Sequence, residues 1–420
     1  MCIDTRARAG HGHLRAWVPY AGFTVFGAFW GVWGASVPAI RDQAGLTDGQ
    51  LGTALLFIAV GALPAMPLAG RAVDRWGHRV TAITLTSLGL AGIAVAVTAH
   101  DLLASSVGLA VLGASSGAAD VTINAAAGSV ERATGRPVIT RAHGFFSLAV
   151  VAASLVTGLL NAAGLPVVVT YVLVLLAAGA VSAALVTGDR ARPDAGRHDH
   201  DRTSAARSRP GLRAHLPLLL VAGGLGALGF AVENAHQSWS AVYLADAVHA
   251  GPALVGAGPA VFALAVSLTR FAISAVQARR AWIVLTAGAV ISAAGTSLLA
   301  LTASLPLALL GLALAAVGTA VLFPTVLALA TANVPGAARG AATSVVSTSA
   351  YLGYLAGPVY VGHWAQASGL PGAMLAVAAL AAALALLAWP ALRAVVPSPA
   401  RQAEVMAAPR PGPRRRSRRG

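Results

Sequence analysis

Long apolar stretches alternate with short polar or charged breaks along almost the whole chain. About twelve windows of roughly 20 residues, each long enough to cross a bilayer as a helix, are separated by glycine, proline or charged residues. We place these windows near residues 17–40, 51–69, 80–98, 102–130, 144–163, 166–187, 215–236, 252–274, 281–300, 306–330, 341–365 and 372–392. The pattern therefore predicts an all-α membrane protein with twelve transmembrane helices.

The composition indicates that the bilayer is the solvent of this chain. Hydrophobic residues make up 57% of the 420 residues and charged residues only 10%, whereas a soluble domain carries about 25% charged residues. The window 17–40 is longer than the apolar core of a secretory signal and leads directly into further windows, so we expect it to stay as the first helix. Cys2 is the only cysteine and precedes every window, so the sequence contains no disulfide signal.

The basic residues predict the orientation of the chain. All 29 of them are arginine. Arg41 falls in an outward segment and Arg270 lies inside a window near its inner end, which leaves 27 of the 29 on one side of the membrane. Because cytoplasmic segments carry the excess of positive charge, we expect both termini in the cytoplasm and the chain in the cell (inner) membrane.

A polar, arginine-rich stretch at 188–214 separates the windows into two groups of six and reads as a disordered linker. The predicted organisation is then a six-helix half at 17–187 and another at 215–392, with cytoplasmic ends at 1–16 and 393–420. Two such halves, related by an axis along the membrane normal, form a repeat whose solute site lies at their interface near the midplane.

A charged hairpin is expected at residues 70–79, a segment at the membrane surface that contains three arginines, one aspartate and two glycines. Its residue order resembles the loop between helices 2 and 3 of transporters of the major facilitator superfamily. In that family the loop latches the two halves together in the outward-facing state. The resemblance implies that the latch residues here are Gly70, Asp74, Arg75, Gly77 and Arg79.

The corresponding segment of the second half offers Arg270, Arg279 and Arg280 without an acidic partner, so we expect that copy of the latch to be lost. Two further patterns, at residues 117–147 and 233–244, are similar to a largely uncharacterised bacterial subgroup, distantly related to sugar permeases of the fucose type. The resemblance covers nearly the whole chain and implies the twelve-helix fold of the superfamily.

Asp120 and Asn124 lie one helical turn apart inside the window 102–130. A carboxylate in a membrane span costs about 2.5–3.5 kcal/mol on insertion scales, so it faces a cavity or a partner. We expect the pair to line the central cavity, where Asp120 takes up a proton from one side and releases it to the other, which couples a proton gradient to solute movement. The alternative is that Asp120 bonds only a neighbouring helix or an arginine.

Glu233 lies in the outer part of the window 215–236 and is expected to contact solute or proton from the second half. Trp239 is a further candidate for substrate contact. Alternatively, Glu233 sits at the headgroup level, and Trp239 and Tyr243 belong to an interfacial aromatic belt.

Three aromatic residues at helical spacing, Phe26, Trp30 and Trp33, are expected to form one face of the first helix. Such rings stack on sugar rings or aromatic solutes, although an aromatic stripe also serves simple packing. His143 begins the fifth window at the cytoplasmic boundary and is a candidate gate, where a histidine is also easily hydrated.

Several other chemistries are not expected. The basic tail at 411–420 reads as a positive-inside anchor on anionic lipid rather than as a nucleic-acid site. The chain has no lysine and therefore no P-loop. The His-Asp-His-Asp run at 198–201 lacks a folded frame, so we expect no metal and no cofactor. The acids inside the spans are scattered, which argues against an enzyme.

The sequence therefore predicts a monomeric secondary transporter that moves a small organic solute by alternating access, coupled to protons. One alternative is a proton-driven efflux pump for a drug or secondary metabolite instead of uptake of a sugar-like solute. A more remote alternative is a membrane sensor that binds a solute without moving it.

Overall fold

The computed structural model describes residues 9–189, 212–273, 281–332, 334 and 336–395. Every regular element within these ranges is a helix, because a helix bonds its own N–H and C=O groups where the bilayer offers no water. The helices are α1 (Ala9–Gln43), α2 (Asp48–Trp76), α3 (His78–Thr98), α4 (Leu102–Thr134), α5 (Val138–Ala162), α6 (Val168–Asp189), α7 (Leu212–Asp246), α8 (Pro252–Val255), α9 (Ala257–Ile273), α10 (Ala281–Leu301), α11 (Leu305–Thr319), α12 (Leu322–Thr331) and α13 (Gly336–Val395).

The prediction of twelve membrane-spanning helices is confirmed. Eleven helical stretches of the described residues are long and apolar enough to cross a membrane. The last belongs to α13, which has 60 residues and would measure about 90 Å, some three times the hydrocarbon thickness of a bilayer. Its helix breaks at Gly369, where φ is 75° and ψ is 168°, a conformation that glycine adopts readily. Counted as two crossings, α13 brings the number to twelve.

The expected hairpin at 70–79 is much tighter than the sequence suggested. Helix α2 continues to Trp76 and α3 begins at His78, so only Gly77 separates them. Gly77 has a φ of 61° and donates its N–H to the Val73 carbonyl at 2.8 Å. Charged residues do not end a helix at the membrane surface, because their side chains reach water while the backbone stays bonded. The charged residues of this segment therefore indicate where the helix leaves the membrane, and they do not indicate where the helix ends.

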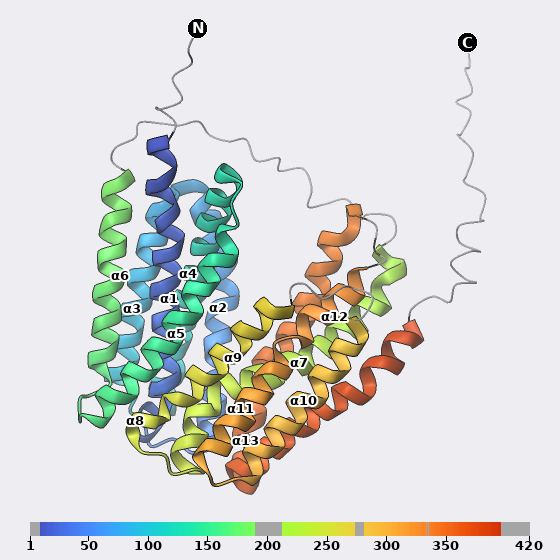
Figure 1. Cartoon of the computed structure of the whole chain (residues 1–420). Coiled ribbons are helices and arrows are strands. Elements are labelled where there is room, and N and C mark those ends of the chain that lie inside the picture. The colour runs from blue at the N-terminus through green and yellow to red at the C-terminus, as the bar shows by residue number, and fades with distance from the viewer. Residues whose placement is uncertain (1–8, 190–211, 274–280, 333, 335, 396–420) are drawn as a thin grey trace, which may run out of the picture.

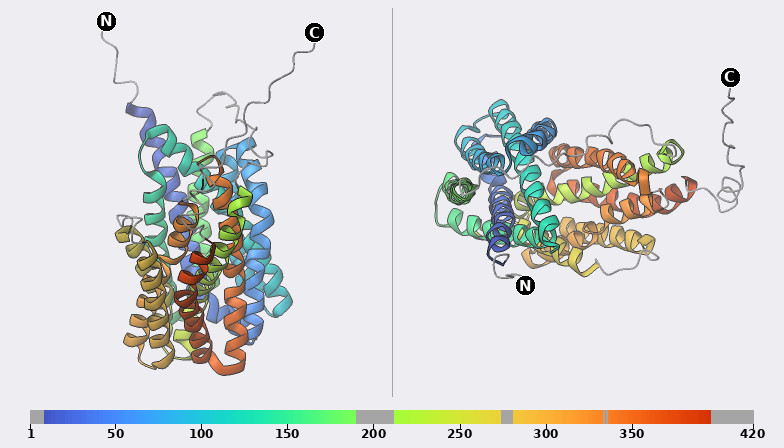
Figure 2. Two further views of the ribbon diagram at one scale, coloured as in Figure 1. Left: turned by 90° about the vertical axis from the view of Figure 1, so that its right-hand side faces the viewer. Right: turned by 90° about the horizontal axis from the view of Figure 1, so that it is seen from above.

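The helices form two groups that stand side by side (Figures 1 and 2). The first half contains α1 to α6, in which α1 packs on α5, α2 on α4 and α3 on α6. The second half contains α7 to α13, in which α7 packs along α13 and α10 packs on α11 and α13. The predicted linker at 188–214 falls largely outside the described residues, as does the basic tail.

Small residues let the helices of each half approach closely. A Cβ added at Gly113 of α4 would lie 1.8 Å from the Ile58 carbonyl oxygen of α2. In the second half, a Cβ added at Gly353 of α13 would lie 1.8 Å from the Ala227 carbonyl oxygen of α7. The helices leave no room for a side chain at either point, as is common where membrane helices associate by van der Waals contact.

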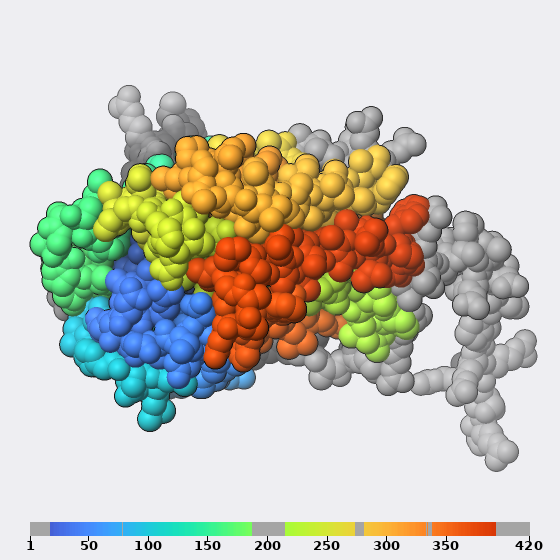
Figure 3. Space-filling view, turned by 90° about the horizontal axis from the view of Figure 1, so that it is seen from below, coloured from blue at the N-terminus to red at the C-terminus, as the bar shows by residue number. Residues whose placement is uncertain are grey.

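The two halves meet at one end of the molecule and diverge toward the other (Figure 1). At the meeting end, which we call the closed end, the backbones of α2 and α13 approach so closely that a Cβ on Gly52 would lie 2.7 Å from the Pro358 carbonyl oxygen. Viewed from this end, residues of α1 and α2 abut α13 and the α8–α9 region across the molecule (Figure 3). The opposite end, where α1 begins and α13 ends, is the open end.

Candidate functional site

A cavity of about 900 Å³ lies between the two halves, a volume within the range of small-molecule sites. Helices α1, α2, α4 and α5 line it from the first half, and α7, α9, α12 and α13 line it from the second. Because both halves supply the walls, any movement of one half against the other changes the shape of the cavity.

The aromatic face expected on the first helix does line this cavity. Phe26, Trp30 and Trp33 project from α1 at intervals of four and three residues, which places them on one face. Phe26 and Trp30 pack edge to face, with ring centroids 6.4 Å apart, and Phe146 of α5 adds a third ring against Phe26 at 5.7 Å. The first half thus presents an aromatic wall to the cavity.

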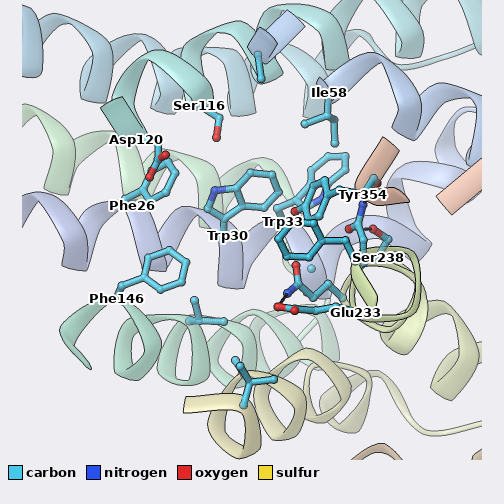
Figure 4. A pocket seen from close by; sticks show the side chains of 18 of the residues that line it. Phe26, Trp30, Trp33, Ile58, Ser116, Asp120, Phe146, Glu233, Ser238 and Tyr354 are labelled. Carbon is cyan, nitrogen blue, oxygen red and sulfur yellow. Dashed lines mark hydrogen bonds between the residues drawn. The ribbon is translucent and has the colours of Figure 1, made fainter. Parts of the chain in front are cut away.

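Asp120 of α4 lies on the same side of the cavity, next to this wall (Figure 4). Its Oδ1 and its backbone carbonyl each accept a hydrogen bond from Asn124 Nδ2 at 2.9 Å. Asn124 itself is not among the lining residues, so its contribution is to orient the carboxylate and not to face the cavity as expected. No arginine or histidine of the described residues forms an ion pair with Asp120.

Glu233 of α7 faces Asp120 from the second half (Figure 4). Arg270 of α9 donates from Nη2 to both carboxylate oxygens, at 3.0 and 3.2 Å. The side chain of Glu233 is 8% exposed and that of Arg270 is 46% exposed. The expectation that Arg270 belongs to a lost latch without an acidic partner is therefore wrong, because its guanidinium lies in the cavity and pairs with Glu233. Arg279 and Arg280 lie outside the described residues.

Neighbouring polar groups on α7 are bonded among themselves. Gln237 Nε2 donates to Glu233 Oε1 at 3.1 Å. Ser238 Oγ donates to Asn234 Oδ1 at 3.1 Å, and Asn234 Nδ2 donates to the Tyr354 carbonyl of α13. These groups line the cavity, but much of their hydrogen-bonding capacity is already used.

Trp239 does not reach the cavity. Its side chain and that of Tyr243 are 0% and 1% exposed inside the second half, and Tyr243 donates its hydroxyl to the Leu299 carbonyl of α10 at 2.8 Å. The substrate-contact role expected for Trp239 is thus a packing role, and the alternative of an interfacial aromatic belt is wrong for both residues. The packing of α7 buries the face that contains Trp239 and Tyr243. The apolar pattern of the sequence does not show which face of a helix is buried in this way.

His143 lines the cavity from α5 with its ring against Phe23, at a centroid distance of 4.8 Å. The expected latch residues lie apart from the cavity, around the turn between α2 and α3. Asp74 and Arg75 are exposed there, and the Arg75 guanidinium lies 5.3 Å from the centroid of the Trp76 ring. The remaining latch positions are Gly70, half-buried in α2, and the exposed Gly77 and Arg79.

Arg41 lies at the closed end, where the two halves meet. Its guanidinium, 12% exposed, donates to Asp48 of α2 at 3.2 Å and to Asp42 of α1 at 2.8 Å. It also donates to Asp246 at the end of α7. One arginine of the first half therefore bonds to the second half across the closed end.

Sequence reasoning missed two of these features. An arginine inside a span, such as Arg270, is a signal for a buried partner, but the sequence does not identify that partner, which lies 37 residues away. The position of Arg41 as the one arginine on the outward side is the sequence signal for its ion pair with Asp246. Among the described residues, no cluster of histidine, cysteine and acidic residues fits a metal ion, and the run at 198–201 lies outside them.

Comparison with known proteins identifies relatives of this chain. The sequence profile of the Major Facilitator Superfamily matches residues 20–243 and 225–417. An uncharacterized MFS-type transporter of Yersinia pestis is 32% identical over 30% of this chain and 33% of its own length. An uncharacterized transporter of Sinorhizobium fredii is 28% identical over 54% of this chain and 58% of its own length. The chain thus spans less than two thirds of these relatives.

Solved structures share the fold at low sequence identity. A bacterial homolog of the human lysosomal transporter Spinster, in an inward-facing and unoccupied conformation, has a TM-score of 0.70 and 16% identity over 93% of this chain and 99% of that chain. The nucleoside transporter NupG has a TM-score of 0.69 and 14% identity over 90% and 99%. The twelve helices of this chain are therefore arranged as in solved transporters.

Proposed function

Because the chain belongs to the major facilitator superfamily and has helices for multiple membrane crossings, we propose that it is a secondary transporter, which carries a small organic solute through the central cavity by alternating access, coupled to protons at Asp120. The observation that carries this proposal is the cavity itself, which both halves line and which holds a carboxylate without a cationic partner among the described residues. An unpaired carboxylate inside a span is a costly feature that marks proton or solute pathways.

The two ends of the molecule have the parts that alternating access needs. The arginine distribution supports a cytoplasmic location for the open end, so this structure corresponds to an inward-facing state. At the closed end, Arg41 and Asp246 hold the halves together. In the opposite state this pair separates, and the latch around Asp74 and Arg75 closes the cytoplasmic end.

Asp120 and Glu233 have different roles in this proposal. Glu233 is held by Arg270 and Gln237, so Glu233 and Arg270 together serve as a fixed ion pair of the second half. Among the residues that the structure describes, Asp120 has the Asn124 amide as its one side-chain partner, which leaves its second oxygen to take a proton. Coupling follows if binding of the proton to the cavity changes binding of the solute, because this linkage lets the proton gradient drive movement of the solute.

The test is solute flux in proteoliposomes with an imposed pH gradient. Uridine and a dipeptide are suitable solutes because similar structures are nucleoside and peptide transporters. Fucose is suitable because of the sequence resemblance to fucose-type permeases. N-methyl-4-phenylpyridinium adds a cation to the set. We expect accumulation or expulsion of one solute against its gradient, and loss of the pH dependence in Asp120→Asn. Asp101→Asn is the matched control, because Asp101 is an N-cap outside the cavity and asparagine caps equally well.

The outcomes separate the alternatives. Unchanged proton-driven flux in Asp120→Asn would refute the coupling role. Binding without any net movement of solute would indicate a sensor. The sign of the gradient that drives accumulation distinguishes uptake from efflux.

A further inference from the structure

We propose that the solute of this cavity is an organic cation: a molecule with one ammonium-type or pyridinium-type group on an aromatic or apolar body. The inference rests on the proposed function for the site and extends it to the chemistry of the solute. It follows from the charge of the cavity, the free hydrogen-bonding capacity of its polar groups, and the nature of its walls.

The charge of the cavity favours a cation. Asp120, Glu233 and Arg270 are the acidic and guanidinium side chains among the described lining residues. The contact of Arg270 Nη2 with both carboxylate oxygens of Glu233 neutralises two of them. The carboxylate of Asp120 is left with one negative charge and no cationic partner among the described residues. An anion in a partly dry site is stabilised by a mobile cation, which is either a proton or a charged solute.

The polar patch of α7 leaves little capacity for a polyhydroxylated solute. A sugar requires many free donors and acceptors around its ring. Here Asn234, Gln237 and Ser238, which form the polar patch of α7, are bonded to one another, to Glu233 or to the backbone of α13. A carboxylate has four acceptor positions on its two oxygens, and that of Asp120 receives one side-chain bond, from Asn124. The strongest free acceptor in the cavity is therefore a single anion.

The walls suit the body of such a cation. Phe26 and Trp30 lie beside Asp120 (Figure 4), so a cation at the carboxylate also lies near aromatic rings. Aromatic faces attract cations, and the indole ring does so most strongly. On the opposite side, Phe230 packs on Phe323 at 4.3 Å and on Tyr351 at 5.6 Å between centroids, and all three line the cavity. The cavity thus combines one anion with two aromatic surfaces.

The test is equilibrium binding of three probes of similar shape to the purified full-length protein in detergent at pH 7.5. N-methyl-4-phenylpyridinium is a cation, 4-phenylpyridine is neutral, and 4-phenylbenzoate is an anion. We expect the cation to bind at least about tenfold more tightly than either of the other probes, as one charge-assisted contact in a desolvated site provides. Tetraphenylphosphonium serves as a second cation of different shape.

Variants of Asp120 decide which group is responsible. Asp120→Asn should weaken cation binding about tenfold or more and leave binding of 4-phenylpyridine unchanged, whereas Asp120→Glu should retain the preference for the cation. Asp101→Asn is the control for loss of an acid elsewhere. Thermal unfolding of each variant shows whether it is folded, and the neutral probe reports on the shape of the cavity.

The outcomes distinguish a failure of this inference from a failure of the proposed function. If neither cation binds, or if the anion binds as tightly as the cation, the inference about solute class is overturned. The proposed function would still hold if the protein moved another solute in a proton-coupled way. If Asp120→Asn retains full preference for the cation, Asp120 is not the recognition group and the inference is also overturned. Tight cation binding without any flux in proteoliposomes supports the inference and contradicts the proposed transport.

Discussion

Arg41 of α1 and Asp246 of α7 form an ion pair between the two halves at the closed end of the molecule. The same guanidinium also bonds Asp48 and Asp42 in its own half, so it is held in position for the contact across the interface. Three acids surround one half-buried arginine, and only Asp246 belongs to the second half. In the proposed alternating access, the pair would therefore act directly on the equilibrium between closed and open arrangements of this end.

Asp246→Asn should shift that equilibrium toward an opening of the closed end. Ion pairs that solvent still reaches contribute about 0.2–1 kcal/mol, which corresponds to a change of roughly 1.4- to 5-fold in the ratio of the two states. The measurement is labelling of Ser267→Cys, a cavity position, by an impermeant maleimide applied from the closed end, in a Cys2→Ser background. Asp42→Asn is the matched control, because it removes an acid that bonds Arg41 within one half. Equal labelling in the two variants would contradict the role of the pair.

Removal of one partner from the Glu233–Arg270 pair should destabilise the protein. Arg270→Gln leaves the buried Glu233 carboxylate without its guanidinium and should cost about 1–3 kcal/mol, at the lower end because Arg270 is half exposed. The double variant Glu233→Gln with Arg270→Gln should recover most of this loss, since it leaves no unpaired charge. Thermal unfolding in detergent measures both. A double variant less stable than Arg270→Gln would show that the carboxylate is stabilised by other groups.

Gly113→Ala should separate α2 from α4. The added methyl group meets the Ile58 carbonyl at a distance that no real contact allows, so the helices must move apart at a cost of about 1–3 kcal/mol. Gly179→Ala in α6 is the control, because a Cβ there meets nothing within 4 Å and alanine favours a helix. We expect a lower unfolding midpoint for the first variant and an equal or higher one for the second. If both variants behave alike, the close approach of α2 and α4 contributes little.

Asp74→Asn should slow turnover without changing binding of solute. Asp74 is exposed and remote from the cavity, and the latch role implied by the family concerns the state in which the cytoplasmic end is closed. Loss of a charge-assisted contact in that state amounts to about a tenfold change in a rate that depends on it. Flux in proteoliposomes and equilibrium binding of the same solute measure the two quantities. A loss of binding equal to the loss of flux would place Asp74 in the site.

The position of Arg270 changes how these variants rank. A lost latch in the second half would make changes near Arg270 nearly silent, so Asp74→Asn would be the more damaging change. Because Arg270 pairs with Glu233 in the cavity, changes at Arg270 are expected to affect both stability and flux.

The sequence predicted the features that depend on local periodicity. Twelve crossings follow from the apolar windows, and the face formed by Phe26, Trp30 and Trp33 follows from helical spacing. Contacts between distant helices were not predictable, because a single sequence contains no signal for which helix packs on which. For this reason Glu233 was identified without its partner, and Trp239 was placed in the cavity although α7 turns it into the core.

The left-handed residue at Gly369 has a consequence for the topology of the whole chain. Without the reversal there, α13 would count as one crossing, and the described residues would make an odd number of crossings, eleven. A residue with a Cβ strains this conformation, while a continuous helix of 60 residues has no place in a bilayer. Whether the described residues make an even or an odd number of crossings therefore depends on the break at Gly369.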